Sequence, residues 1–276
     1  VRHLSMWAST LVLLFYIAKI IIHPSAVKAE YSNTVPASLY AGITMVTMIL
    51  CSYYKVWFPT ACKWIFITAV CVHAVHILVF LCRNVFKGVN LDTFVPSWFV
   101  TFNGIMVSLV AGPDMLPSAM AKAVLYWGLF IYTVTIPFMV WRLITREVKP
   151  GMLHTQAIVL APCSLCLVSY LNIVKEPVRA VVMILYVCVI LSLLFILVKL
   201  PRFFSVPFAP GFAGLTFPMA IGVVASTKAG SYLAGIGNEV LAYGVKQVAG
   251  IQIYVTTAII GMVLFGFMKM LAGKKA

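Results

Sequence analysis

Residues 209–226 read APGFAGLTFPMAIGVVAS, which is an unusual composition for a membrane helix. The stretch has no charge and is long enough to cross a bilayer core of about 30 Å as a helix. It nevertheless contains Pro210, Pro218 and three glycines, which interrupt or weaken a helix. Because lipid offers no hydrogen bonds, the carbonyls that a proline frees must find protein or water. The stretch therefore predicts an inner membrane helix rather than one that faces lipid.

The composition of the chain is that of an integral membrane protein. Of its 276 residues, 63% are hydrophobic and 9% are charged, with a mean hydropathy of +1.07. A soluble domain of this length carries far more polar residues. Apolar runs recur along the whole length, so we expect a single transmembrane domain over residues 1–276. The seven cysteines mostly lie inside these runs, where a thiol acts as a small hydrophobe and not as half of a disulfide framework.

Apolar runs of about 20 residues, the length that a membrane helix requires, predict an all-helical protein with nine spans. They cover residues 4–22, 35–54, 64–82, 93–113, 123–141, 156–174, 180–198, 203–227 and 250–268. Of the 20 lysines and arginines, eight lie on the side of the N-terminus and twelve on the other side. The positive-inside rule then predicts a multi-pass protein of the cell (plasma or inner) membrane with a cytoplasmic C-terminus. Because the basic residues flank spans singly or in pairs, the net charge of +14 does not predict a nucleic-acid partner.

The predicted spans are of two kinds. Those that start near residues 4, 64, 123, 180 and 250 are plainly apolar, as in AVVMILYVCVILSLLFILV. The four between them carry Pro, Gly, Ser, Thr and Asn, as in VPASLYAGITMVTM, VPSWFVTFNGIMVSLVAG and LAPCSLCLVSYLN. Their marking prolines are about 50 to 65 residues apart, which indicates a repeated hairpin of one special and one plain helix. These prolines are Pro36, Pro96, Pro162 and Pro210. Small and hydroxylated residues favour close packing or a wet cavity, so we expect the special helices inside a ring of plain ones, around an axial pathway.

Four segments in this order resemble the tellurite-resistance/dicarboxylate transporter family, which includes bacterial TehA and the plant guard-cell slow anion channels. They are HPSAVKAEYSNTVPASLY, VPSWFVTFNGI, AIVLAPCSLCLVSYLNI and FAGLTFPMAIGVVAS. The resemblance covers essentially the whole chain. It implies ten helices in five hairpins with quasi-five-fold symmetry around a central pore, and assembly as a homotrimer. On that plan the first helix is missing from this sequence, which agrees with an N-terminus on the outer side.

The resemblance places the phenylalanine that occludes the family's pore at Phe217. The residue before a proline is disfavoured in the helical conformation. We therefore expect a kink at Phe217–Pro218, in the middle of the span, that directs the ring toward the axis. Gly104 and Gly214 are further expected sites of irregular helix. A buried core phenylalanine beside a tolerated proline is the alternative that the residues alone favour.

Hydroxyl and amide groups of the special helices are the candidates for contact with a passing anion, because they can donate hydrogen bonds. The main candidates are Ser38, Thr44, Thr101, Asn103, Ser164 and Thr216, with Thr47, Ser97, Ser108 and Ser169 as further ones. A cation at the centre of a span costs roughly 2.5–3.5 kcal/mol and would hold an anion tightly. Basic residues instead lie at span ends, where they either attract anions to the cytoplasmic mouth or only set the topology. These mouth charges are Arg142, Arg146, Lys149, Lys199 and Arg202.

The expected function is an anion channel or channel-like exporter for small inorganic or organic anions, with no enzyme activity, cofactor or metal. A proton-coupled carrier for C4-dicarboxylate, sulfite or tellurite is the main alternative. Two patterns favour a different class, a thiol or haem oxidoreductase, but only weakly. Cys163 and Cys166 form a C-x-x-C pair without a nearby base, and His73 and His76 lie on nearly the same face of one helix. No pair of acidic residues lies inside a span. This argues against a hydrolytic enzyme and makes a proton-coupled carrier the weaker alternative.

Overall fold

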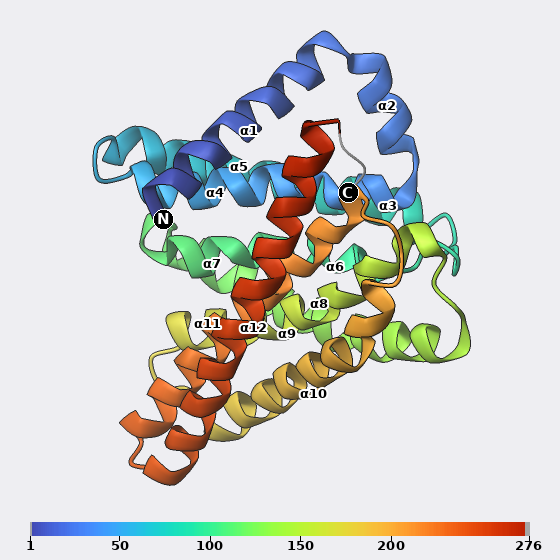
Figure 1. Cartoon of the computed structure of the whole chain (residues 1–276). Coiled ribbons are helices and arrows are strands. Elements are labelled where there is room, and N and C mark those ends of the chain that lie inside the picture. Colours follow the sequence, from blue (N-terminus) through green and yellow to red (C-terminus); the bar gives the residue numbers. More distant parts are fainter. Residues whose placement is uncertain (1, 274–276) are drawn as a thin grey trace. The chain divides into compact units, whose positions relative to one another are not determined.

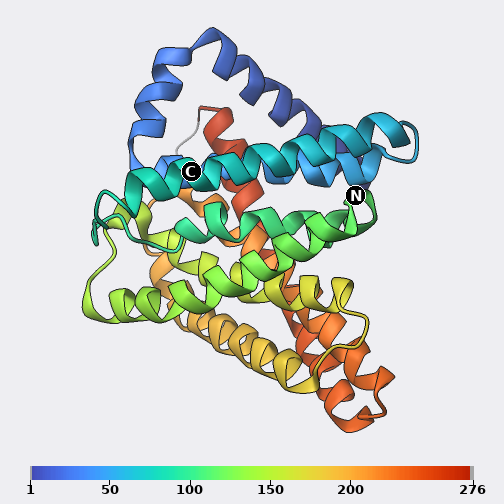
Figure 2. The same cartoon turned by 180° about the vertical axis from the view of Figure 1, so that it is seen from behind.

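A computed structural model describes residues 2–273, and all regular structure in this range is helical. The chain folds as two compact units, unit 1 over Val1–Thr135 and unit 2 over Ile136–Ala276, which are described one at a time. Figures 1 and 2 trace the chain from helix α1 to helix α12 from two opposite sides.

Eight helical segments in the described range are long and apolar enough to cross a membrane. Five are single α-helices, and three combine shorter pieces. The single helices are α1 (Arg2–Ile22), α5 (Pro59–Asn84), α8 (Ser118–Thr145), α10 (Arg179–Phe203) and α12 (Glu239–Leu271). The combined segments are Thr34–Tyr54, Pro150–Ile173 and Pro210–Gly235. The structure thus confirms an all-helical protein with many spans.

The predicted continuous helix over residues 93–113 is wrong. The chain there forms α6 (Trp98–Phe102), the 3-10 segment η1 (Gly104–Met106), α7 (Val107–Ala111) and η2 (Pro113–Met115). Pro96 lies just before the start of α6, and Gly104 is the first residue of the 3-10 segment η1. Both residue types disfavour a long continuous α-helix. Nearly every residue from Phe94 to Leu109 is buried, so neighbouring protein surrounds this irregular backbone.

The two kinds of span differ in structure as well as in sequence. The plain spans are unbroken α-helices, even where Pro137 and Pro201 lie inside them. Each special span contains a break. Helix α3 (Thr34–Leu39) meets α4 (Ala41–Tyr54) at Tyr40, η3 (Pro150–Val159) leads into α9 (Leu160–Ile173), and η4 (Pro210–Leu215) leads into α11 (Thr216–Gly235).

The special spans are also the more buried ones. Three of them qualify as candidate spans, and in these 44–83% of the most apolar 18-residue stretch is buried. The corresponding share in the plain helices is 0–39%. Helix α1 has no buried residue at all in its described length. This contrast agrees with special helices that lie inside and plain helices that face lipid.

The predicted mid-helix kink at Phe217–Pro218 is also wrong. Helix α11 begins at Thr216, so Pro218 is its third residue and Phe217 has helical conformation. The change of winding occurs earlier, where the 3-10 turn of η4 ends at Leu215. A proline is tolerated in the first turn of a helix because that amide has no intrahelical partner there. Pro36, Pro162 and Pro210 likewise lie within the first three residues of α3, α9 and η4.

Within unit 1, α4 lies beside α5 and also contacts α1 and α7, while α3 contacts α6 (Figure 2). Short helix α2 (Pro24–Ser32) joins α1 to α3. Within unit 2, α11 packs against α12 and α9, α9 also packs against α10, and η3 lies against η4 (Figure 1). Each unit therefore contains two of the four special spans.

Candidate functional site

The special spans of unit 2 approach each other closely through glycines. A β-carbon on Gly214 in η4 would lie 3.3 Å from the carbonyl oxygen of His154 in η3. A β-carbon on Gly222 in α11 would lie 2.9 Å from a methyl group of Leu160 in α9. The His154 ring is buried, lies 3.8 Å from the Phe212 ring centroid to centroid, and donates from Nε2 to the carbonyl of Phe203 at 3.0 Å. The irregular starts of both spans are thus fixed against each other.

Phe217 lies two residues after this junction, in the first turn of α11. Its ring is partly exposed, whereas the neighbouring Pro218 and Met219 are buried. The aromatic cluster around His154 includes Phe203 and Phe212 but not Phe217. Phe217 is therefore no fully packed core residue of unit 2, and its role as the occluding residue stays a prediction.

Four of the six main hydrogen-bonding candidates are completely buried and bonded within their own unit. Ser38 donates to Ser97 at 2.8 Å, and Thr101 donates to the Ser38 carbonyl at 3.0 Å. Asn103 donates to the Gly128 carbonyl at 2.9 Å, and Ser164 to the Leu160 carbonyl at 2.6 Å. Three of the four further candidates are buried too, namely Ser97, Ser108 and Ser169. Each of these bonds occupies a donor inside the protein, and the Thr101 bond satisfies the Ser38 carbonyl close to the break at Tyr40.

Thr44 and Thr216 are the two main candidates with partly exposed side chains. Thr216 Oγ1 donates to the Ala213 carbonyl at 2.8 Å, one turn back. Thr44 Oγ1 lies 2.8 Å from the Ala41 carbonyl and 2.7 Å from Nδ1 of His73. Among the main candidates, these two are the best placed to meet a ligand, and contact of any candidate with an anion stays a prediction.

A histidine pair on α5 ties together the special spans of unit 1. His73 is fully buried and bonds Thr44 on α4 through Nδ1 and the Thr101 carbonyl on α6 through Nε2, at 2.7 and 2.9 Å. His76 bonds the Tyr31 hydroxyl through Nδ1 at 2.8 Å and Thr101 Oγ1 through Nε2 at 3.2 Å. Hydrogen bonds thus occupy all four ring nitrogens, which leaves none directed at a metal or haem.

Sequence reasoning identified this pair but not its partners. The spacing of three residues placed both rings on one face of the helix, yet nothing in the chain's order indicates that Thr44 and Thr101 meet that face. Gly104 is the one nearby signal: a β-carbon there would lie 3.0 Å from Cε1 of His73. The glycine therefore provides room for the ring and does more than allow an irregular helix.

The C-x-x-C pair lies inside α9. Cys163 and Cys166 are both buried and free, and the Cys163 thiol donates to the Leu160 carbonyl at 3.3 Å. Within residues 2–273, no three acidic, histidine or cysteine side chains are grouped so as to hold a metal ion.

The proposed mouth charges are of two kinds. Arg146, Lys149 and Arg202 are exposed, but Arg142 is 1% exposed. Its guanidinium donates to the carbonyls of Arg146 and Glu147, each at 3.4 Å, just beyond the end of α8. A positive charge at the C-terminal end of a helix also interacts favourably with the negative end of the helix dipole. Arg142 therefore holds the end of α8, a role that its place in the sequence did not indicate.

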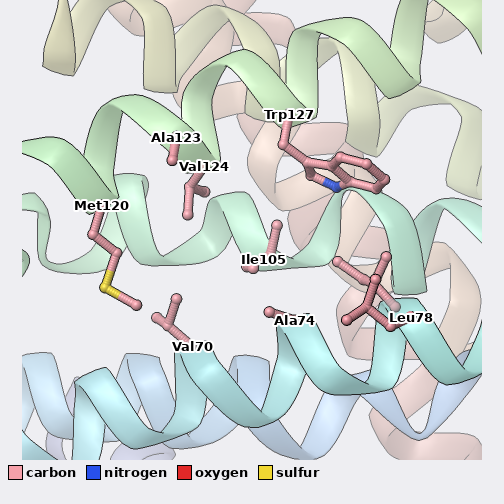
Figure 3. A pocket seen from close by; sticks show the side chains of 9 residues that line it. Val70, Ala74, Leu78, Ile105, Met120, Ala123, Val124 and Trp127 are labelled. Carbon is pink, nitrogen blue, oxygen red and sulfur yellow. The ribbon is translucent and has the colours of Figure 1, made fainter.

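A cavity of about 300 Å³ in unit 1 lies between α5 and α8. Figure 3 shows Val70, Ala74 and Leu78 from α5 opposite Met120 and Trp127 from α8. The lining is apolar, and the Trp127 indole N–H is already donated to the Phe102 carbonyl at 3.0 Å. The cavity offers no hydrogen-bond donor to an anion and suits apolar groups instead.

Two carboxylates outside the spans are held in their charged form. Glu30 on α2 accepts hydrogen bonds from Lys19 at 2.7 Å and from the Tyr40 hydroxyl at 2.8 Å, and these bonds lower its pKa. Asp114 accepts a hydrogen bond from Lys55 at 2.6 Å, which lowers the pKa of its carboxyl. Neither group is suited to take up a proton near neutral pH.

A sequence model of the family described as voltage-dependent anion channel, SLAC1, matches residues 3–271. No curated protein matches the chain. The family match includes all of the predicted site residues and every candidate span except for the first residue of α1. It agrees with the four motifs that resemble the tellurite-resistance/dicarboxylate transporters and with a multi-pass membrane protein. The chain therefore belongs to the SLAC1 family of voltage-dependent anion channels.

Proposed function

We propose that the protein is a channel or channel-like exporter for small anions, with a path formed by the four special spans and occluded by Phe217. One observation carries the proposal: the helix of each of the four spans is interrupted, yet none of the spans has a charged residue at its centre. Lys228 lies in the last two turns of α11 and donates to Asn172 at 2.9 Å. Weak polar contacts let an anion leave as readily as it enters, as conduction requires.

The proposal includes the architecture that the family resemblance implies. We propose five hairpins with quasi-five-fold symmetry around the path, a homotrimer with one path per subunit, and a cytoplasmic C-terminus. The alternation of plain and interrupted spans supports the hairpin plan. The bias of basic residues supports the orientation, and the exposed Arg146, Lys149 and Arg202 would then attract anions to the cytoplasmic mouth.

Anion efflux from proteoliposomes tests the proposal. Purified protein should release trapped chloride or nitrate down its gradient once a potassium ionophore balances the charge. It should do so without a proton gradient. Saturable uptake that requires a proton gradient would instead identify a proton-coupled carrier, and absence of any anion flux would contradict both.

The effect of replacing Glu30 distinguishes a channel from a proton-coupled carrier. A proton-coupled carrier needs a group that gains and loses a proton near the working pH, but the bonds from Lys19 and Tyr40 lower the pKa of Glu30. We expect Glu30→Gln to leave the pH dependence of anion flux unchanged. Loss of proton-driven uptake in Glu30→Gln, with uptake retained in the matched variant Asp114→Asn, would favour the carrier.

The same lowered pKa sets how Glu30 contributes to stability. A carboxylate whose pKa is lower in the folded state stabilises the fold fully above the unfolded pKa of about 4.3, and loses this effect as the pH falls through the lowered folded value. Thermal unfolding in detergent should therefore show a difference between Glu30→Gln and the parent at neutral pH. This difference in stability should shrink only when the pH falls below the unfolded pKa of about 4.3.

A further inference from the structure

The hydroxyl of Thr44 lies between two groups that compete for its one proton. Oγ1 is 2.7 Å from Nδ1 of His73 and 2.8 Å from the carbonyl oxygen of Ala41. The carbonyl only accepts hydrogen bonds, whereas Nδ1 accepts or donates according to the protonation of the ring. The state of His73 therefore decides how the hydroxyl is oriented.

The opposite side of the His73 ring fixes its tautomer. Nε2 is 2.9 Å from the carbonyl oxygen of Thr101, so Nε2 carries a proton and donates it. In the neutral ring, Nδ1 then has only a lone pair. A contact of 2.7 Å to Thr44 is favourable only if the hydroxyl donates to Nδ1. Thr44 in this state directs its proton at the ring and presents lone pairs to its exposed side.

A second proton on His73 reverses this arrangement. Nδ1–H then donates to Thr44 Oγ1, and the hydroxyl proton must turn away from the ring, to the Ala41 carbonyl or to a ligand. An anion accepts hydrogen bonds and is repelled by lone pairs. Protonation of His73 thus converts a repelling oxygen into a donor and adds a positive charge behind it.

His76, one turn further along α5, has the same tautomer but a different neighbourhood. Thr101 Oγ1 gives its proton to the Ser38 carbonyl at 3.0 Å, so Nε2 of His76 must donate to that oxygen. Nδ1 then accepts from the Tyr31 hydroxyl at 2.8 Å. None of these bonds reaches Thr44, which makes His76 a matched control on the same helix.

The charged and titratable groups around His73 are few. The His76 ring lies 6.4 Å away between centroids, Tyr31 comes from α2, and the Arg83 guanidinium lies 5.1 Å from the Tyr31 ring. The segments α3, α4, α6 and η1, which also pack on α5, contain no Asp, Glu, His, Lys or Arg. The segment η2 brings Asp114, which is paired with Lys55. No carboxylate in the described contacts of the ring stabilises its charged form, and the ring is fully buried, so it takes up a second proton only in acid well below neutral pH.

We propose that His73 is a positioning residue for anion passage, which sets whether the Thr44 hydroxyl repels or binds an anion, and that its protonation raises anion conductance. The inference rests on the proposed channel function, because it requires that anions pass Thr44. It assigns the buried histidine a role in conduction that a purely structural pair lacks.

Planar-bilayer conductance at equal pH on both sides tests the proposal. The parent should conduct more at about pH 4 than at about pH 7.5, because a fully buried ring without a counter-charge becomes charged only in acid. We expect a rise of roughly threefold to tenfold, the size of one net hydrogen bond. Thr44→Val and His73→Gln should abolish the rise, since one lacks the hydroxyl and the other cannot take up a proton. Thr44→Ser and His76→Gln should keep it.

Three results would overturn the proposal: a parent conductance that does not change with pH, a rise that persists in Thr44→Val, or one that persists in His73→Gln. Absence of anion current from the parent at both pH values would instead contradict the channel function.

A second measurement needs neither current nor a conducting variant. In ¹⁵N spectra of histidine-labelled protein, the His73 signals should show Nε2 protonated and Nδ1 accepting at neutral pH. A ring with Nδ1 protonated at neutral pH would refute the mechanism.

Discussion

Replacing Phe217 with alanine should raise the anion conductance of the protein on the order of tenfold or more, because an apolar ring across a narrow path acts as a constriction that anions must cross without water. The ring lies at the start of α11, beside the glycine contact that fixes η4 against η3, and it is partly exposed. Its removal should therefore widen the proposed path without emptying a packed core. Currents in oocytes or planar bilayers, scaled to the amount of protein, measure the change.

Phe138→Ala is the matched control. Phe138 lies on the plain helix α8 and is 62% exposed, so its loss should leave the conductance unchanged. Equal currents from the parent and Phe217→Ala would remove Phe217 from the occluding role. Equal increases in both variants would point to a general loosening of the membrane domain.

Replacing Gly214 with leucine should destabilise the protein by about 1–3 kcal/mol, the usual range for overpacking. A β-carbon at this position would lie 3.3 Å from the backbone oxygen of His154, and a rigid backbone cannot turn aside as a side chain can. The longer side chain must then separate η4 from η3, which together fix the start of α11. Thermal unfolding in detergent should show a lower midpoint for Gly214→Leu and a much smaller shift for Gly214→Ala.

Gly250→Leu provides the control for this substitution. Gly250 lies inside helix α12, and a β-carbon there would meet no atom within 4 Å. Leucine also has a higher helix propensity than glycine, so this variant should be as stable as the parent or more so. Equal destabilisation of both variants would show that the η3–η4 contact is not what makes Gly214 sensitive.

The sequence predicts the two kinds of helix well because proline and glycine act locally. Each of Pro36, Pro162, Pro210 and Pro218 lies in the first turn of a helical segment, where the missing amide costs nothing. The same residues mislead about where a break occurs. Pro218 favours a kink at Phe217, but η4 already changes the winding at Leu215, so Pro218 starts a new helix instead of bending an old one.

What the sequence does not predict depends on contacts between distant residues. The Thr44–His73 hydrogen bond joins residues 29 positions apart, and no local pattern shows it. Arg142 looks like a flank charge at a span end, yet its guanidinium is buried against the carbonyls that follow α8. By hydropathy, residues 93–113 likewise form one apolar run. The chain there breaks into short helices, because the surrounding protein can bond the backbone groups that the breaks leave free.

The most direct test of the account is the reversal potential of purified protein in a planar bilayer with different chloride concentrations on the two sides. If the protein is an anion channel, the reversal potential should follow the chloride gradient and stay unchanged when a proton gradient is added. A reversal potential that follows the cation gradient, or one that moves with the proton gradient, would contradict it.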